Sequence, residues 1–167
     1  AIHDAGVIHR DLKPKNILMT LRHDIKISDF STAICPALGP LPYDVGRVGT
    51  YEYMSPEVLA KGIADVRSDI FALGVIGYQM ITGELPFKTE KFASHRDPTR
   101  KGTPKPPHRL RAQCPRALSR LLMCALDAKP ARRPQSAAQM HRELQSLSFA
   151  RTRKLTQSLF GFLRKKN

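Results

Sequence analysis

The sequence predicts a mainly α-helical fold with one small β-hairpin near its start. Residues 69–82 are apolar on nearly every side, as expected of a helix in the centre of a domain. Residues 115–126 and 134–147 each begin with a proline and place apolar side chains at helical spacing. Short β-type runs at 17–19 and 25–28 flank a polar turn and predict the hairpin. With 167 residues, of which 41% are hydrophobic, the chain is one domain or part of one.

The first residues are predicted to form the last turn of a helix that Gly6 closes, because glycine tolerates the left-handed backbone that often follows a helix. Residues 8–16 follow directly, with the sequence IHRDLKPKN. Within this segment Asp11 carries a carboxylate, Lys13 a cation and Asn16 an amide oxygen, all on one short loop.

This segment resembles the catalytic loop of protein kinases, and its Lys-Pro pair resembles the serine/threonine branch of that family. Further blocks follow in family order up to residue 147, in a style similar to bacterial eukaryotic-like serine/threonine kinases. The resemblance implies that residues 1–147 form the large, C-terminal lobe of the kinase fold. It also implies ATP and Mg²⁺ as cofactors, and transfer of the γ-phosphate to Ser or Thr hydroxyls of protein substrates.

The resemblance also implies a role for each matching residue. Asp11 would orient the substrate hydroxyl and act as base, while Lys13 would neutralise the transferring phosphoryl group. Asn16 and Asp29 would hold Mg²⁺. Lys13, Asn16 and Asp29 would contact ATP together with Leu18, which would lie under the adenine ring. A plain core leucine is the alternative for Leu18.

Asp29, Phe30 and Ser31 stand where the family has Asp-Phe-Gly. Asp29 keeps the metal-binding carboxylate, although a structural aspartate in a turn is the alternative. Serine is less tolerant of positive φ than glycine, so we expect this loop to switch less freely between conformations. His9, Arg10 and Phe30 are expected to support the site.

Residues 32–54 match the activation segment of the family. Between residues 33 and 49 there is no Ser or Thr, and only Tyr43 could be phosphorylated. Family members with an arginine before the catalytic aspartate often pair it with a phosphorylated loop residue. One hypothesis is therefore that Asp44 gives Arg10 a fixed negative charge; the alternative is an exposed aspartate in a loop.

Four further residues are expected to brace the loop: Thr50, Glu57, Asp69 and Arg133. By family resemblance, Thr50 would hydrogen-bond the catalytic Asp and Lys and shape the floor of the substrate side. Glu57 would form a buried ion pair with Arg133, because a buried carboxylate must be paired. Asp69 would accept backbone N–H groups of the catalytic loop; the alternative is a carboxylate that only favours its helix dipole.

The second half of the chain carries the weaker predictions. Residues 88–114 are expected to hold one short helix at best, near residues 88–95, with loop around it. Residues 148–167 fall outside the resemblance and are predicted to be a basic tail or juxtamembrane-like segment. The side chains expected to face inward on the last two helices are those of Leu118, Leu121, Leu122, Ala125, Ala137, Met140, Leu144 and Leu147.

The net charge of +14 is uneven. Residues 1–87 hold 8 Lys/Arg and 10 Asp/Glu, whereas residues 88–167 hold 20 Lys/Arg and 4 Asp/Glu, a net +16. An anionic membrane surface is one partner that such a half could attract, and a solvated basic face is the alternative. Nucleic acid is an unlikely partner, because aromatic interleaving and a groove-reading motif are missing.

The composition also bears on location and completeness. Three cysteines at irregular spacing indicate free thiols in a reducing compartment, and so a cytoplasmic chain, at the inner face of a membrane if a longer chain reaches one. No apolar run of membrane-spanning length or signal peptide is visible. The chain opens without Met on a helix end, and by the resemblance we expect it to be cut, without the small N-terminal lobe and its Gly-rich loop.

Two functions therefore remain open from the sequence. One is a serine/threonine kinase whose fragment alone binds ATP weakly and transfers no phosphate, because parts that the reaction needs are missing. The other is a non-catalytic, truncated kinase-like module that binds partners.

Overall fold

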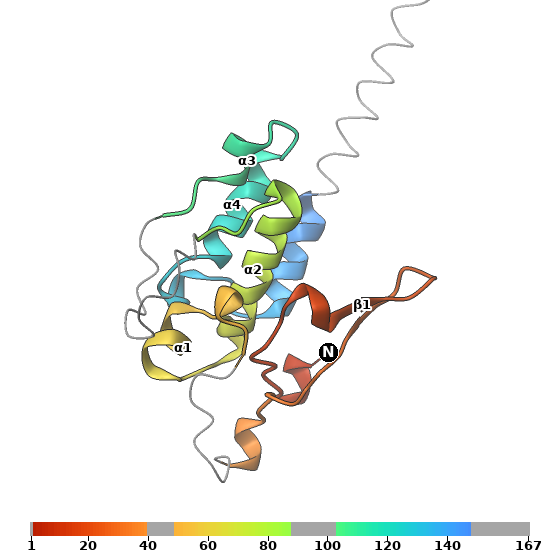
Figure 1. Ribbon diagram of the computed structural model, residues 1–167, viewed down its shortest axis with the longest axis vertical. Helices are drawn as coiled ribbons and strands as arrows, with labels where there is room; N and C mark the ends of the chain where they lie inside the picture. Colours follow the sequence, from red (N-terminus) through yellow and green to blue (C-terminus); the bar gives the residue numbers. More distant parts are fainter. Residues whose placement is uncertain (1, 40–48, 88–102, 148–167) are drawn as a thin grey trace, which may run out of the picture.

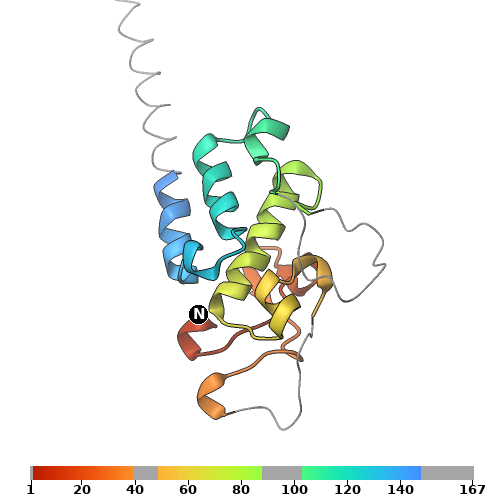
Figure 2. The same ribbon diagram turned by 90° about the vertical axis from the view of Figure 1, so that its left-hand side faces the viewer.

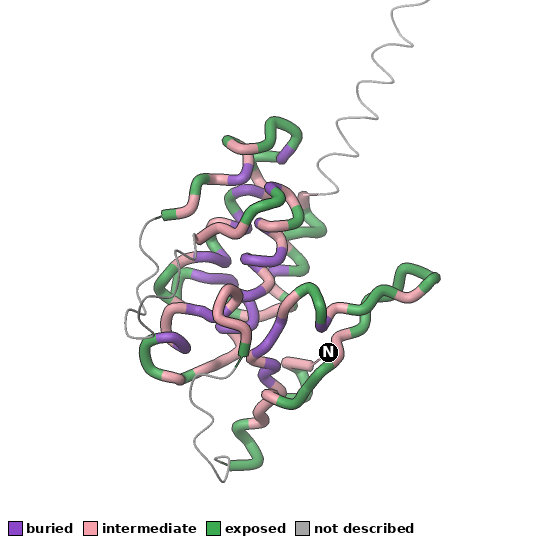
Figure 3. The backbone as a smooth tube through the Cα atoms, in the orientation of Figure 1, coloured by how far each residue is buried: buried purple, intermediate pink, exposed green. Residues whose placement is uncertain are grey.

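The fold is organised around one long helix. The computed structural model describes residues 2–39, 49–87 and 103–147. Helix α2 (Val66–Thr82) runs through the middle of the molecule (Figure 1), and the side chains of Ile70, Phe71 and Val75 on it are fully buried. Buried segments gather on α2 and on the chain that faces it (Figure 3). The prediction of a central apolar helix is confirmed.

Helix α2 begins earlier than predicted because of its cap. Asp65 precedes the helix, and its carboxylate accepts the backbone N–H of Arg67 at 2.7 Å. The backbone N–H of Asp65 in turn donates to the hydroxyl of Ser68 at 3.2 Å, which completes a capping box. The helix therefore starts at Val66, and Asp69 lies in its first turn rather than at its start.

Two helices pack against α2 on one side (Figures 1 and 2). Helix α4 (Arg116–Ala125) comes close because α2 presents glycine there: a Cβ at Gly77 would lie 2.7 Å from a methyl carbon of Leu122. The last helical segment covers residues 137–147. Its Met140 joins the buried cluster of α2 and α4.

The prediction that Leu144 faces inward is wrong, since its side chain is 39% exposed. A helix turns about 100° per residue. Met140 is buried and Glu143, three residues later, is half-buried, so the buried face of this segment runs through these two positions. Leu144 therefore lies at the edge of that face.

Part of the predicted loop before α4 is helical. Helix α3 (Pro107–Leu110) is one turn long, and it begins with a proline whose fixed φ suits a first helical position. Pro107 is buried, and Leu110 packs on the cluster that contains Phe71 and Tyr78. The loop prediction for this stretch is therefore corrected, while the helix expected near residues 88–95 lies outside the described residues.

The predicted hairpin is present. Strands β1 (Ile17–Met19) and β2 (Ile25–Ile27) pair antiparallel, with Ile17 opposite Ile27 and Met19 opposite Ile25. Ile17 and Ile27 pack on the cluster of α2 that includes Ala72, whereas the outer pair is mostly exposed. The hairpin is thus anchored to the core at its base only.

The remaining elements are short. The first turn is a 3-10 helix closed by Gly6 at φ 72°, so the predicted helix end is present in tighter form. Helix α1 (Pro56–Lys61) begins with a proline, and Gly62 at φ 69° caps its end. Among the described residues, no helix has the length and apolar character needed to cross a membrane. The short helices are η1 (His3–Ala5), η2 (Pro14–Asn16), η3 (Pro36–Leu38), η4 (Tyr51–Tyr53), α1 (Pro56–Lys61) and η5 (Pro130–Arg132).

Candidate active site

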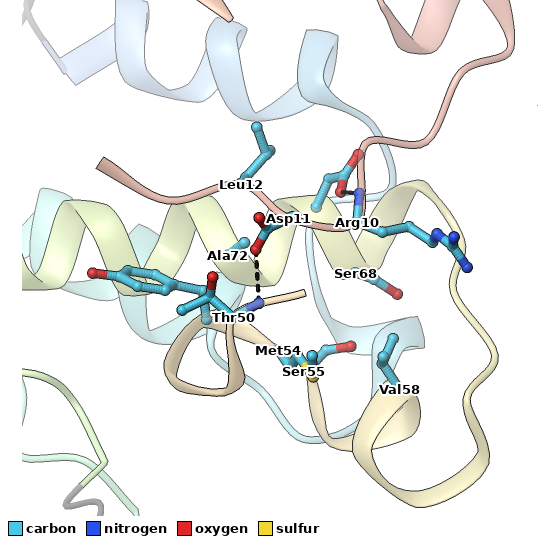
Figure 4. Close-up of a pocket in the computed structure, with 11 residues that line it drawn as sticks. Arg10, Asp11, Leu12, Thr50, Met54, Ser55, Val58, Ser68 and Ala72 are labelled. Carbon is cyan, nitrogen blue, oxygen red and sulfur yellow. Dashed lines mark hydrogen bonds between the residues drawn. The ribbon is translucent and has the colours of Figure 1, made fainter. Parts of the chain in front are cut away.

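Asp11 is held by hydrogen bonds on both of its carboxylate oxygens. The ammonium group of Lys13 donates to Oδ2 at 2.6 Å and to the hydroxyl of Thr50 at 2.9 Å. The backbone N–H of Thr50 donates to Oδ1 of Asp11 at 2.7 Å (Figure 4). Asp11 is only 6% exposed, so these bonds fix the direction of its side chain. The structure thus brings together three of the residues singled out in the sequence.

The same bonds decide the charge of Asp11. Burial alone would raise its pKa, because a buried carboxylate loses hydration. The hydrogen bonds from Lys13 and Thr50 outweigh burial and hold the pKa of Asp11 below its ordinary value. Asp11 is therefore an anion at neutral pH.

Asp69 of α2 holds the backbone of the loop from below. One of its oxygens accepts the N–H of His9 at 2.8 Å, and the other accepts the N–H of Arg10 at 2.9 Å. Arg10 has φ 67°, a backbone conformation that is costly for a residue with a long side chain. Asp69 is 1% exposed, so its two bonds are shielded from water and stabilise this strained turn.

His3 is a site residue that the sequence did not reveal. Its Nε2 lies 2.9 Å from the Asp69 oxygen that also binds the N–H of His9. His3 thereby ties η1 to the same carboxylate that holds the loop of residues 8–16. Its separation of 66 residues from Asp69 leaves no local spacing signal that could have identified the pair.

His9 and Phe30 connect the loop to the hairpin. Nδ1 of His9 lies 3.3 Å from the backbone N–H of Asp11 and accepts it, so Nε2 is the nitrogen that donates to the carbonyl of Ser28 at 3.1 Å. The rings of His9 and Phe30 have centroids 4.9 Å apart. His9 is completely buried and therefore joins the two segments as a fixed bridge.

Asn16 and Asp29 lie at the open end of the hairpin. The side-chain NH₂ of Asn16 donates to the carbonyl of Asp11 at 2.9 Å, and no described residue donates to its amide oxygen. The N–H of Ser28 donates to the carbonyl of Asn16 at 2.9 Å, which places the next residue, Asp29, beside this strand end. The charges of Asp11 and Lys13 both act on Asp29, so these groups are electrostatically close.

The donor set of Asn16 and Asp29 fits Mg²⁺. Among the described residues, no group of three or more His, Cys, Asp or Glu side chains could form a closed metal cage. Mg²⁺ in phosphoryl-transfer sites takes one or two protein oxygens and completes its shell with phosphate and water. An exposed carboxylate and an amide oxygen match that requirement.

Ser31 plays a different part from the one expected. Its hydroxyl donates to Oδ1 of Asp29 at 2.6 Å, and this bond lowers the pKa of Asp29. The positive φ of this turn, 63°, belongs to Asp29 itself, and Ser31 is not among the described residues with positive φ. In this conformation Ser31 therefore carries none of the backbone strain that a glycine would relieve. Reduced switching of the loop stays a prediction.

Glu57 and Arg133 form the ion pair that the sequence predicts. Nη1 and Nη2 of Arg133 donate to the two carboxylate oxygens of Glu57, each at 2.7 Å. The side chain of Arg133 is fully buried and its guanidinium lies 4.9 Å from the ring centroid of Phe71. Burial would raise the pKa of Glu57, but the bonds from Arg133 outweigh it and lower that pKa.

Tyr43 and Asp44 of the activation-segment hypothesis lie outside the described residues. Nε of Arg10 donates to the carbonyl of Thr32 at 2.6 Å. Leu18 is 52% exposed, so the core-leucine interpretation is wrong and the adenine-contact role stays a prediction.

Comparison with known proteins gives a consistent family. The family described as "Protein kinase domain" matches residues 1–144. The chain is 42% identical over 161 residues to "Serine/threonine-protein kinase pkn3" of Myxococcus xanthus, and this match covers 90% of the chain and 29% of the relative. It is 39% identical over 151 residues to "Serine/threonine-protein kinase Pkn1" of the same organism, covering 87% and 22%. It is 33% identical over 144 residues to "Serine/threonine-protein kinase PknB" of Mycolicibacterium smegmatis, covering 85% and 23%. The chain thus spans less than a third of the length of these relatives.

Proposed function

Since the chain belongs to the protein kinase family, of the bacterial serine/threonine type, we propose that residues 1–147 are the large, C-terminal lobe of an enzyme that transfers the γ-phosphate of ATP to Ser or Thr hydroxyls of protein substrates. The observation that carries the proposal is the carboxylate of Asp11, ionised and held on both oxygens by Lys13 and Thr50. Such an arrangement suits a group whose task is to aim a hydroxyl.

Asp11 orients the acceptor hydroxyl in this proposal. Each carboxylate oxygen has more than one acceptor site, so the bonds to Lys13 and Thr50 leave room for one from a substrate O–H. A low pKa makes Asp11 a weak base, which suits a reaction that depends on positioning and electrostatics more than on early proton removal.

In this proposal Lys13 and Thr50 act at the two sides of the reaction: Lys13 on the phosphoryl group and Thr50 on the substrate side. Lys13 carries its positive charge 2.6 Å from Asp11, beside the place where a phosphoryl group would meet the hydroxyl. Thr50 opens η4 (Tyr51–Tyr53), so its bonds to Asp11 and Lys13 would link substrate binding to the alignment of the catalytic pair.

Asn16 and Asp29 would hold Mg²⁺, which supplies neutralisation of phosphate charge when bound. Lys13 and Leu18 would complete the contacts to ATP. A preceding small lobe would supply the remaining contacts, so we expect the 167-residue chain alone to bind ATP weakly and transfer no phosphate.

The free cysteines among the described residues support a cytoplasmic location. An anionic membrane surface is the partner proposed for the basic half of the chain.

The test is phosphate transfer by the longest natural chain that contains these residues, with radiolabelled ATP and a Ser/Thr-rich acceptor protein. Asp11→Asn should lower kcat at least about a hundredfold. Asp24→Asn, at the exposed turn of the hairpin, is the matched control and should leave kcat unchanged.

Thr50→Ser should keep most of the rate that Thr50→Ala loses, because serine keeps the hydroxyl that accepts from Lys13, whereas alanine keeps only the backbone N–H that donates to Asp11. Equal rates for Asp11→Asn and the wild type would contradict the proposal. They would favour the non-catalytic binding module, which has no need of a fixed Asp11.

A further inference from the structure

The hydroxyl of Ser31 gives Asp29 a hydrogen-bond donor that the family pattern lacks. It donates to Oδ1 of Asp29 at 2.6 Å, and both residues are exposed. The family pattern at these positions, Asp-Phe-Gly, ends in a residue without a side chain. Among the described residues, no other side chain donates a hydrogen bond to this carboxylate. The contact is therefore a feature of this chain, and it acts on a group proposed to bind Mg²⁺.

Ser31 lies in a turn that is anchored on the catalytic loop. The N–H of Ala33 donates to the carbonyl of Phe30 at 3.0 Å, which closes the turn around Ser31. The ring centroid of Phe30 lies 4.9 Å from that of His9, and the hydroxyl of Thr32 donates to the carbonyl of His9 at 2.9 Å. The residues on both sides of Ser31 are thus held by His9, which is completely buried. The hydroxyl of Ser31 therefore approaches Asp29 from a fixed backbone.

The backbone of Asp29 is also fixed, which leaves its side chain as the part that can rotate. The N–H of Ser28 donates to the carbonyl of Asn16 at 2.9 Å, directly before Asp29. Asp29 itself has φ 63°, a left-handed conformation that sets the direction of its Cβ. An exposed aspartate without a donor would exchange between rotamers. The bond from Ser31 selects one of them, so the carboxylate is oriented before a cation arrives.

The two oxygens of this carboxylate differ in what they can still bind. Each carboxylate oxygen has about two acceptor sites, and Oδ1 uses one of them for Ser31. Oδ2 accepts from no described side chain, so it is the oxygen that a cation meets unhindered. A cation that bound both oxygens would compete with the hydroxyl of Ser31. Mg²⁺ demands near-ideal octahedral geometry, whereas Ca²⁺ takes more oxygen ligands and accepts bidentate carboxylates. The arrangement therefore favours Mg²⁺ over Ca²⁺.

We propose that Ser31 is a positioning residue for the metal: its hydroxyl holds the carboxylate of Asp29 so that Mg²⁺ binds through Oδ2 alone. The inference deepens the proposed function and rests on Asp29 as a metal ligand, but it concerns binding of the ion and not transfer of phosphate. Hydrogen-bond partners of metal ligands typically contribute about tenfold or more to metal affinity. Because this bond is exposed, we expect about fivefold, the equivalent of one ordinary hydrogen bond.

The test is Mn²⁺ binding by the longest natural chain that contains these residues. Mn²⁺ prefers the same oxygen ligands in octahedral sites as Mg²⁺, and the electron paramagnetic resonance signal of the free ion reports its binding directly. A non-hydrolysable ATP analogue is present, because phosphate completes the shell of the metal. Binding to the analogue without protein is subtracted.

Ser31→Ala should weaken Mn²⁺ binding about fivefold. Ser31→Thr keeps the hydroxyl and should stay within about twofold of the wild type. The affinity for Ca²⁺, measured by competition with Mn²⁺, should not fall in Ser31→Ala, because a bidentate ion no longer competes with a hydroxyl for Oδ1. The preference for Mn²⁺ over Ca²⁺ should therefore fall about fivefold, which a loss of folding alone would not produce.

A matched control removes a hydroxyl from the hairpin turn. Thr20 accepts the N–H of Asp24 at 3.1 Å through its hydroxyl, and Thr20→Ala should keep Mn²⁺ binding within about twofold of the wild type. Ser31→Ala should unfold at the same urea concentration as the wild type, because substitutions at exposed positions change stability little.

Three outcomes would overturn the proposal. The first is Mn²⁺ binding in Ser31→Ala that equals or exceeds that of the wild type. The second is a fall in Mn²⁺ and Ca²⁺ affinity by the same factor, which would mean that Ser31 only supports the fold. The third is wild-type Mn²⁺ affinity in Asp29→Asn, since Ser31 acts through Asp29. A wild type that binds Mn²⁺ as expected but transfers no phosphate would instead contradict the proposed function and leave the role of Ser31 intact.

Discussion

Removing the charge of Glu57 should destabilise the protein far more than removing an exposed charge. Glu57→Gln keeps the size of the side chain but leaves Arg133 without an anionic partner. Arg133 has 0% side-chain exposure, so its guanidinium cannot turn to water. The backbone carbonyls of Asp127 at 2.8 Å and Arg67 at 3.0 Å would still accept from it, but neither carries a charge.

The magnitude follows from the burial of the two partners. Breaking a fully buried ion pair by removing one partner costs about 3–5 kcal/mol. The side chain of Glu57 is 20% exposed, so water already screens part of the interaction. We therefore expect Glu57→Gln to lower the free energy of unfolding by about 2–4 kcal/mol, a large share of the about 5–15 kcal/mol typical of a folded domain.

The assay is equilibrium unfolding in urea, followed by circular dichroism. Arg67→Gln is the control, because its ion pair with Asp65, at 2.6 Å, is as close as that of Arg133 with Glu57, at 2.7 Å, to within 0.1 Å, but its side chains are 31% and 42% exposed. An exposed pair should cost less than about 1 kcal/mol. Arg133→Met keeps an unbranched stem against Phe71 without the charge. The double variant Glu57→Gln/Arg133→Met should lose at least about 1 kcal/mol less than the two single losses added together. A loss in Glu57→Gln no larger than that in Arg67→Gln would refute the reasoning.

Three further predictions concern Asp69, the contact of α2 with α4, and acid. Asp69→Asn should lower the free energy of unfolding by about 1–3 kcal/mol in urea, because its amide group cannot accept at both oxygen positions; a loss under about 0.5 kcal/mol would contradict this. Gly77→Ala should lower the melting temperature, since its Cβ would lie 2.7 Å from Leu122 and overpacking outweighs the gain in helix propensity; a higher melting temperature would contradict it. The pKa of Glu57 is depressed on folding, so its stabilisation is present above its ordinary value of 4.5 and is lost as pH falls through the folded-state pKa. The urea midpoint should therefore fall on acidification below that value, less steeply in Glu57→Gln, and a midpoint that rises would contradict the sign.

Elements with a strong local pattern could be predicted from the sequence. The helix around Ile70 was predicted because its segment is apolar on nearly every side, and the hairpin because two short β-type runs flank a polar turn. The ends of such elements depend on caps: the capping box of Asp65 and Ser68 starts α2 at Val66, whereas the sequence predicted a start at residue 69. Helix α3 was missed because one turn gives no periodicity, and it forms where Pro107 and Leu110 find a core to pack on.

The candidate site divides in the same way. Asp11, Lys13 and Asn16 could be identified because the short segment that holds them resembles the catalytic loop of a known family. The Glu57–Arg133 partnership was accessible only through resemblance to a family, because nothing local links residues 76 apart. His3 had no such help and was missed.

The strained backbone of the catalytic loop ties its geometry to the core. Arg10 and Asp29 both have positive φ, which costs about 1–3 kcal/mol for a residue such as arginine and less for aspartate. The bonds of Asp69 to the backbone at His9 and Arg10 offset part of this cost, and Asp69 is placed by the first turn of α2. Any substitution that shifts the first turn of α2 must therefore also weaken the bonds that hold the backbone at His9 and Arg10 in its strained conformation. Stability of α2 and alignment of Asp11 should fall together, whereas losses confined to α3 or the hairpin tip should leave that alignment intact.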